Sequence, residues 1–125
     1  MYIELLKGKI HRATVTEADL NYVGSLTLDE DLMLAAGFQE YEKIEVLDIT
    51  NGNRISTYII KGKRGSGHIC INGAAAHHIH IGDLVIIVGY CQLTKEEAIS
   101  HKPLVVHVNE NNKIVNLKLE KNINE

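Results

Sequence analysis

The sequence predicts a mainly-β fold, either a compact barrel or a sandwich. Many short runs rich in Ile, Val, Leu, Thr and Tyr are separated by turn residues, as expected for strands. At 125 residues, with 45% hydrophobic and 23% charged residues, the chain suits one globular domain with a real core. The strand pattern alone does not choose between a barrel and a sandwich.

Each expected strand is an apolar or β-branched run bounded by polar residues, glycine or asparagine. Asn51-Gly52 is a strong signal for a tight hairpin turn between two of these runs. In chain order, the expected strands are Tyr2–Leu6, Ile10–Val15, Ser25–Leu28, Ile44–Thr50, Arg54–Ile60, His68–Ile71, Leu84–Tyr90, Leu104–Asn109 and Ile114–Leu119.

Two short helices are expected between the strands. The first covers residues 30–36, because Asp29 can cap its N-terminus and Gly37 can end it. The second begins at Thr94, which forms a capping box with Glu97. The single proline of the chain follows a few residues later and prevents this helix from continuing far.

Composition argues against several classes of partner. The formal net charge is -3 and no basic block is present, so neither nucleic acid nor a charged membrane surface is an expected partner. The apolar run Leu84–Val88 is too short to span a bilayer, and Met1–Glu4 lacks the features of a signal peptide. Cys70 and Cys91 form no CxxC pair and are expected to be buried free thiols. These features predict a cytoplasmic protein.

Gly24 and Ser25 form a pair with a specific chemistry. A serine hydroxyl can attack the carbonyl carbon of the peptide bond before it, which moves the acyl group from nitrogen to oxygen and gives an ester. β-Elimination then leaves a dehydroalanine, which hydrolyses to a pyruvoyl group. Glycine suits the first position because it tolerates strained backbone geometry and leaves its carbonyl open. Since an isolated Gly-Ser pair is usually a turn, the other segments must decide between the two interpretations.

The strand that follows the predicted hairpin turn carries a polar face. Alternation places Arg54, Ser56 and Tyr58 on one face and Thr57 on the other. An arginine can bind a carboxylate through two parallel hydrogen bonds, and a tyrosine can act as a general acid. Taken alone, the segment is more typical of a solvent-exposed strand face.

A turn rich in small residues follows the expected strand that ends at Ile71. Asn72 and Gly73 begin this turn, and Ala74, Ala75 and Ala76 continue it. Small side chains let a ligand approach backbone N–H groups, which can bind an anion. An ordinary strand-to-helix turn is the alternative interpretation.

Two further motifs are weak. His77, His78 and His80 have no nearby carboxylate or cysteine that would complete a ligand set, so no metal site is expected. The loop 61–67 is rich in glycine and basic residues but lacks the order of a phosphate-binding loop, so a flexible solvent loop is expected.

Taken together, these segments resemble the pyruvoyl-dependent aspartate decarboxylase family. The resemblance covers nearly the whole chain and becomes weaker after about Pro103. Each motif alone is weak, whereas their order and spacing together are specific. The residues that carry it are Lys9–Thr16, Ala18–Ser25, Thr50–Gly52, Arg54–Tyr58 and Asn72–His77.

The resemblance implies a double-psi β-barrel with short helices, formed by residues 1–125 as one domain. It also implies that an inactive precursor cleaves itself between Gly24 and Ser25, into a β chain of residues 1–24 and an α chain of residues 25–125. The pyruvoyl cofactor would come from Ser25, and four copies would form a homotetramer with active sites between subunits. The resemblance leaves open whether a separate maturation protein assists the cleavage.

The implied activity is that of a carboxy-lyase, which converts L-aspartate to β-alanine and CO2 for pantothenate biosynthesis. The pyruvoyl ketone would form a Schiff base with the substrate amine and accept the electrons released with CO2. Ser25 and Tyr58 are the implied catalytic residues, with Tyr58 as proton donor. Lys9, Arg54, Thr57, Gly73, Ala74 and Ala75 are the implied substrate-binding residues, and His11, Tyr22 and Asn72 are expected to shape the pocket.

Two details of this expectation stay open at the sequence level. Lys9 and Arg54 both match positions that hold substrate carboxylates, and the sequence does not assign one carboxylate to each. Two other functions also compete with the implied one: a β-barrel that binds a ligand or forms an assembly without cleaving itself, and a pyruvoyl enzyme that decarboxylates histidine or arginine.

Overall fold

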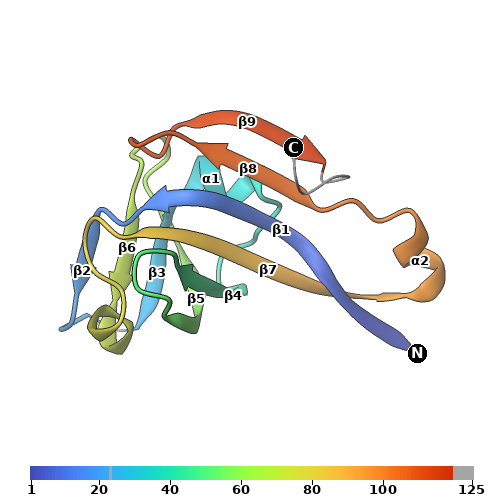
Figure 1. Cartoon of the computed structure of the whole chain (residues 1–125), viewed down its shortest axis with the longest axis horizontal. Coiled ribbons are helices and arrows are strands. Elements are labelled where there is room, and N and C mark those ends of the chain that lie inside the picture. The colour runs from blue at the N-terminus through green and yellow to red at the C-terminus, as the bar shows by residue number, and fades with distance from the viewer. Residues whose placement is uncertain (23, 120–125) are drawn as a thin grey trace.

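Strand β1 (Tyr2–Thr14) is the longest element and pairs on both of its edges. It lies antiparallel to β7 (Leu84–Thr94) and parallel to β8 (Leu104–Val108). Figure 1 shows β1 and β7 crossing the molecule together and extending beyond it towards the N-terminus. The structure is a computed structural model that describes residues 1–22 and 24–119.

The other strands continue this sheet on either side. They pair in the order β2-β6-β3-β5-β4-β7-β1-β8-β9. The mainly-β prediction is confirmed, but the strand pairs of the described residues form an open series that does not close into a barrel. The remaining strands are β2 (Glu17–Asp19), β3 (Ser25–Asp29), β4 (Lys43–Asp48), β5 (Arg54–Gly62), β6 (Ile69–Asn72) and β9 (Ile114–Leu119).

The N-terminal strands differ from the prediction in two ways. The expected strands 2–6 and 10–15 are one continuous strand, because Gly8 does not break it. Gly8 instead allows close approach, since a side chain there would collide with the carbonyl oxygen of Ala36. Irregularities at Gly8 and between Ile10 and Ala13 bend the strand, and Arg12 adopts a φ of 63° at the second one. Strand β2 was not predicted because it is short and polar.

Both predicted helices are confirmed with their caps. Helix α1 (Glu30–Ala35) begins after Asp29, whose side chain accepts a hydrogen bond from the backbone N–H of Asp31, and Gly37 follows it with a φ of 76°. Helix α2 (Lys95–Ile99) begins at the expected capping box of Thr94 and Glu97. A 3-10 helix, η1 (Gly73–His77), forms the turn that the small residues predicted.

The β4–β5 hairpin is also confirmed, and it is tied to the loop after η1. Gly52 takes the positive φ that the turn needs, 81°. The side-chain amides of Asn51 and Asn53 both donate to the carbonyl oxygen of His78, each at 2.9 Å. These two bonds fix the hairpin, from which β5 begins, to the segment that follows η1.

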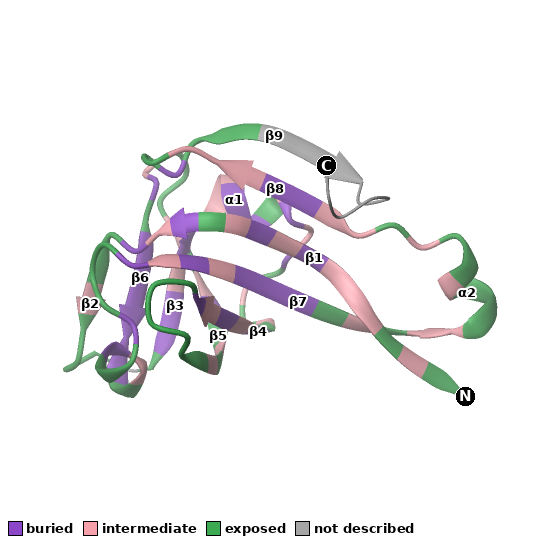
Figure 2. Ribbon diagram, viewed as in Figure 1, coloured by how far each residue is buried: buried purple, intermediate pink, exposed green. Residues whose placement is uncertain are grey.

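One face of the sheet is covered by the hydrophobic core. Ile10 of β1, Leu26 of β3, Ile59 of β5 and Ile71 of β6 are fully buried. Figure 2 shows this buried zone over the middle of the sheet, whereas the arm formed by the ends of β1 and β7 is largely exposed. Because strand residues alternate between faces, the residues next to these core positions project from the opposite face.

Two buried carboxyl groups meet where the hairpin contacts the loop before β7. Asp48 accepts hydrogen bonds from the backbone N–H groups of Thr50 and Asn51, and Asp83 accepts one from that of His80. Burial, together with a hydrogen bond to Asp83, raises the pKa of Asp48 from 3.8 to about 6. The same hydrogen bond lowers the pKa of Asp83. The pair therefore shares one proton in mildly acidic solution, with Asp48 as the donor.

Asp48→Asn tests this shared proton. The native state keeps the Asp48 proton up to about pH 6, whereas the unfolded chain releases it near 3.8. The stability that this group adds is thus full below about pH 4 and is lost as the pH rises to about 6. The lowered pKa of Asp83 acts only at more acidic pH, because that contribution is complete above the unfolded pKa. Asp48→Asn keeps a donor at every pH, so the Tm difference between pH 4 and pH 6.5 should shrink by several degrees relative to the wild type.

Thermal unfolding of both proteins across this pH range is the measurement. Glu110→Gln, which removes an exposed carboxylate, is the matched control and should follow the wild-type curve. An Asp48→Asn curve parallel to the wild-type curve would show that the pair holds no proton in the native state.

Candidate active site

Ser25 opens β3 and lies opposite Asn72, the last residue of β6. The two residues are direct partners in the antiparallel pairing of these strands. The Asn72 side-chain amide donates to Ser25 Oγ at 3.1 Å and to Thr27 Oγ1 at 3.0 Å. Only 2% of Ser25 is exposed, and only 3% of Asn72. The hydroxyl is therefore held in a defined position, largely shielded from water.

Tyr58 lies beside Ser25 on the neighbouring strand. β3 and β5 are parallel, and Leu26 is paired with Ile59 in the core. Ser25 and Tyr58 each precede these residues by one position, so both belong to the face opposite the core. The structure thus places Tyr58, Ser25 and Asn72 in one row across β5, β3 and β6.

Gly73, the first residue of η1, lies in close contact with Gly24 at the predicted cleavage position. Its φ is 75°, a conformation that residues with a side chain rarely adopt. A Cβ at Gly73 would lie 2.6 Å from Gly24 Cα and 2.8 Å from Gly24 N. The turn predicted from the small residues is therefore in direct contact with the Gly24-Ser25 pair.

Gly24 has room for a side chain in this structure. A Cβ there would meet only the carbonyl oxygen of Asn72, at an ordinary 3.8 Å. The exposed position of Gly24 also leaves the backbone around its carbonyl uncrowded.

Arg54 and Lys9 lie outside the Ser25 row. Arg54 is four residues before Tyr58, about 13 Å along β5 at ~3.3 Å per residue. Lys9 is on β1, which is four places from β3 in the strand order, about 19 Å along the sheet surface through the intervening strands. The strand pairing therefore places neither cation in that row.

The other predicted site residues divide between these two regions. Tyr22 lies near Ser25: a Cβ at Gly73 would be 3.1 Å from the Tyr22 carbonyl oxygen, although the Tyr22 side chain is exposed. His11 is on β1 with Lys9, and its ring packs edge-on against His107 at 5.5 Å. Thr57 alternates to the opposite face from Tyr58 and is paired with the buried Ile44. The structure does not bring Thr57 or His11 to Ser25.

Backbone groups of η1 lie next to the Ser25 row. Ala74 is exposed and Ala75 is half-buried. Asn72 is the N-cap residue of this helix, but its side chain makes no capping bond because it is engaged with Ser25 and Thr27. The Asn72 side chain therefore does not cap the backbone N–H groups in the first turn of η1. The predicted substrate contacts of Gly73, Ala74 and Ala75 require that these N–H groups have no such cap.

Sequence reasoning missed the contacts that Thr27, Cys70 and Glu17 make in this region. Thr27 accepts the second hydrogen bond of Asn72. Cys70, predicted only as a buried free thiol, lies 3.1 Å from Asn72 Oδ1 and 3.2 Å from the Glu17 carboxylate. The signal that could have found Thr27 and Cys70 is the i, i+2 spacing of strands, which puts Thr27 on the face of Ser25 and Cys70 on the face of Asn72.

A cavity of about 430 Å3 opens beside Tyr58, at the end of the Ser25 row. It is lined by Glu4, Lys43, Ile44, Glu45 and Tyr90. Lys43 is the strand partner of Tyr58. Two glutamates in the lining disfavour an anionic ligand, so this cavity is a poor candidate for binding a dicarboxylate.

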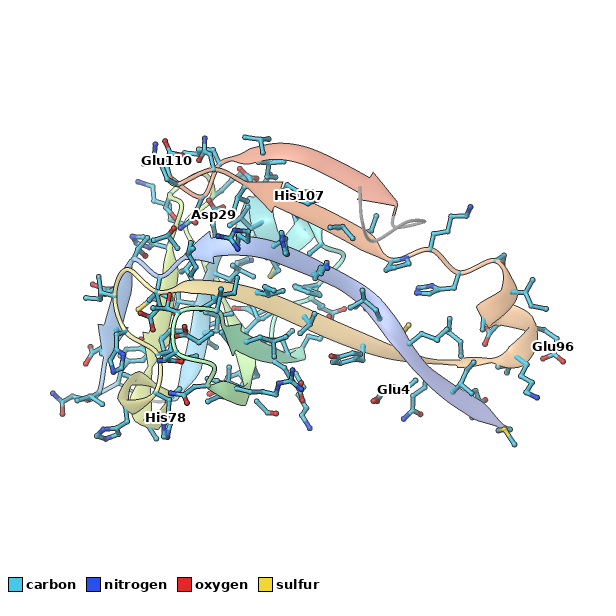
Figure 3. The ribbon with its side chains drawn as sticks, in the orientation of Figure 1. Glu4, Asp29, His78, Glu96, His107 and Glu110 are labelled. Atoms are coloured by element: carbon cyan, nitrogen blue, oxygen red, sulfur yellow. The ribbon has the colours of Figure 1, made fainter. Side chains whose placement is uncertain are left out.

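The described residues give no support to the histidine stretch as a metal site. Within residues 1–22 and 24–119, no three His, Cys, Asp or Glu side chains are arranged to hold a metal ion. His77, His78 and His80 are exposed, and Figure 3 shows His78 at the η1 end of the molecule. In the same part of the chain, no helix is long and apolar enough to cross a membrane.

Comparisons with known proteins agree on one family. Residues 1–115 match the family model described as aspartate decarboxylase. A protein of Caldicellulosiruptor bescii named aspartate 1-decarboxylase is 62% identical over 117 residues, which cover 94% of this chain and 91% of that protein. Proteins of the same name are 61% identical over 120 residues in Acetivibrio thermocellus (96% and 95% covered) and 60% identical over 112 residues in Campylobacter hominis (90% and 96% covered).

Gly73→Ala tests the close approach between Gly73 and Gly24. The substitution forces a side chain into the left-handed region, at a cost of about 1–3 kcal/mol, and pushes Gly24 away. We expect a lower denaturation midpoint and a chain that no longer cleaves at Gly24, as read by intact mass under denaturing conditions.

Two matched variants separate strain from contact. Gly52→Ala has a similar positive φ, 81°, but nothing within 4 Å of the new Cβ, so it should lose stability without affecting cleavage. Gly24→Ala has room for its Cβ and should change stability by less than about 0.5 kcal/mol. Normal cleavage of Gly73→Ala would show that this contact does not position Gly24.

Proposed function

This chain belongs to the aspartate decarboxylase family, and we infer from that membership that it is a lyase that converts L-aspartate to β-alanine and CO2, a step towards pantothenate. The structural observation that supports this function is Ser25, buried directly after Gly24 and hydrogen-bonded to Asn72. A buried serine at this position is what a cofactor made from the chain itself requires.

The proposed cofactor is a pyruvoyl group made by self-cleavage between residues 24 and 25. Ser25 Oγ bonds to the carbonyl carbon of Gly24, the peptide C–N bond breaks, and the hydroxyl proton moves to the nitrogen. Loss of the Ser25 Cα proton then breaks the Cβ–Oγ bond and releases Gly24 as a carboxylate. Water replaces the nitrogen of the remaining dehydroalanine, and ammonia leaves. The products are a β chain of residues 1–24 and an α chain that starts with the pyruvoyl group.

The surroundings of Ser25 fit this group. Asn72 provides an N–H donor at 3.1 Å from Oγ, which carries negative charge when its proton leaves and again when the Cβ–Oγ bond breaks and Oγ departs as part of the Gly24 carboxylate. A pyruvoyl group supplies a ketone that takes up the amine of the substrate and accepts the electron pair released with CO2. The site is buried on the η1 side and borders the exposed Tyr58 on the other, so substrate can approach from the Tyr58 side.

Tyr58 is proposed as the proton donor of the reaction. Its register places it next to Ser25, and a phenol carries a transferable proton in neutral solution. Of the three residues in this row, Tyr58 is the one with an acidic side-chain proton.

Arg54 and Lys9 are proposed to bind the two carboxylates of the substrate, with at least one of them supplied by a second copy of the chain. Neither belongs to the Ser25 row of the same chain, and the paths along the sheet to that row, about 13 Å and 19 Å, support a shared site. The face that carries them also presents Leu47, Ile86 and Tyr90, which are half-buried or exposed and would gain from being covered. A homotetramer with sites between subunits would satisfy both observations.

The proposed location is the cytoplasm. Cys70 and Cys91 are both free thiols, as expected in a reducing compartment.

Ser25→Ala and Tyr58→Phe together test the proposed function by separating cleavage from turnover. Ser25→Ala removes the nucleophile, so it should stay as one chain and release no CO2 from L-aspartate. Tyr58→Phe keeps the ring and loses only the hydroxyl, so it should cleave normally, while turnover falls by roughly 10²–10⁴-fold, the range for a lost general acid. Intact mass and CO2 release from L-aspartate are the two measurements.

Wild-type protein assayed with L-histidine and L-arginine is the control for substrate, and neither should be decarboxylated. Two fragments from Ser25→Ala would disprove self-cleavage by Ser25. A wild-type turnover rate in fully cleaved Tyr58→Phe would assign the proton to water or another residue.

A further inference from the structure

Cys70 links a carboxylate to the amide that holds Ser25. The thiol lies on β6, two residues before Asn72, and its strand partners are Glu17 on β2 and Thr27 on β3. Its sulfur is 3.2 Å from Glu17 Oε2 and 3.1 Å from Asn72 Oδ1. Asn72 in turn donates to Ser25 and Thr27. These contacts link residues on three strands, and the single S–H of Cys70 can donate to one of its two oxygen neighbours at a time.

The Cys70 thiol keeps its proton under all ordinary conditions. Burial, together with the hydrogen bond to Glu17 and the nearby charges of Glu17 and Asp19, raises the pKa of Cys70 to about 12. Only 5% of the residue is exposed. Cys70 is therefore a weak but permanent S–H donor, whose one hydrogen can point either to the Glu17 carboxylate or to the Asn72 carbonyl oxygen.

This donor decides which end of the Asn72 side chain faces Ser25. The oxygen and nitrogen of an asparagine amide are nearly equal in size, so hydrogen-bond partners select its orientation. The hydroxyls of Ser25 and Thr27 could bond to either end, because a hydroxyl both donates and accepts. Cys70 is different: when its S–H turns from Glu17 to Asn72 it needs an acceptor there, so this state favours the amide oxygen on the side of Cys70 and the NH2 group on the side of Ser25.

We propose that Cys70 is a positioning residue for self-cleavage, which acts by turning the NH2 group of Asn72 onto Ser25 Oγ. With NH2 on that side, Oγ receives a hydrogen bond when it carries charge, first as its proton leaves and later as the Cβ–Oγ bond breaks and Oγ departs in the Gly24 carboxylate. With the amide reversed, Asn72 Oδ1 would take the Ser25 hydroxyl proton as a hydrogen bond and would repel the developing negative charge. The inference rests on the proposed self-cleavage of the chain.

The test compares Cys70→Val with Cys70→Ser in the full-length chain. Valine has a similar shape but no donor, whereas serine keeps a donor in a smaller side chain. Loss of a hydrogen bond that acts in the transition state corresponds to about a tenfold change in rate. We expect Cys70→Val to cleave about tenfold more slowly than the wild type and Cys70→Ser to stay within about threefold, as followed by intact mass during a time course.

Three further variants make the comparison decisive. Cys91→Val, at the other free thiol, should cleave at the wild-type rate. Glu17→Ala leaves Asn72 as the only protein acceptor in the series for the thiol, so it should cleave at least as fast as the wild type. If Cys70 acts through Asn72, Cys70→Val should cause no additional slowing in an Asn72→Ala background.

The outcomes separate the possible failures. A wild-type chain that never cleaves would disprove the proposed function itself. If the wild type cleaves, equal rates for Cys70→Val and Cys70→Ser would overturn the positioning role, as would faster cleavage of the valine variant, which packing alone predicts. Tenfold slowing that persists in the Asn72→Ala background would likewise show that Cys70 does not act through Asn72.

Discussion

The pairing of β3 with β6 is the constraint on which the candidate site depends. It sets Ser25 opposite Asn72, so that a buried hydrogen bond of 3.1 Å holds the hydroxyl. The same register brings Gly73 against Gly24, in a contact that leaves no room for a side chain at Gly73. A shift of one residue would move Ser25 to the core face. Leu26 and Ile71, which adjoin Ser25 and Asn72 on the two strands, oppose such a shift because their buried side chains would become exposed.

Local signals in the sequence were sufficient for most elements of the fold. Capping residues such as Asp29 and Thr94 act within one helical turn, and the Asn51-Gly52 turn depends only on its own backbone geometry, so these features were predicted and are confirmed. Strand order was not predictable, because it depends on contacts between distant residues. Gly8 shows the same limit: the sequence cannot reveal that its neighbour is the Ala36 carbonyl.

The candidate site was predictable in its parts but not in its arrangement. The family resemblance named Ser25, Tyr58 and Asn72, and the structure brings these three into one row. The structure leaves Arg54 and Lys9 outside this row. The sequence could not predict this for Lys9, because Lys9 lies on a different strand and its position depends on the strand order. Cys70 was predicted as a buried thiol, and its contact with Asn72 needs both the strand alternation and the burial of the pair. The strand order is therefore compatible with the proposed site shared between copies.

Co-assembly of two inactive variants tests the shared site most directly. Ser25→Ala and Arg54→Ala chains are combined, native mass spectrometry confirms mixed assemblies, and intact mass confirms that the Arg54→Ala chains have cleaved. If Ser25 and Arg54 of one site come from different copies, the mixture should regain part of the L-aspartate decarboxylation that each variant lacks. Ser25→Ala combined with Tyr58→Phe is the control and should regain none, because these residues adjoin within one chain. Mixed assemblies of the first pair with no activity above that of the separate variants would contradict the shared site.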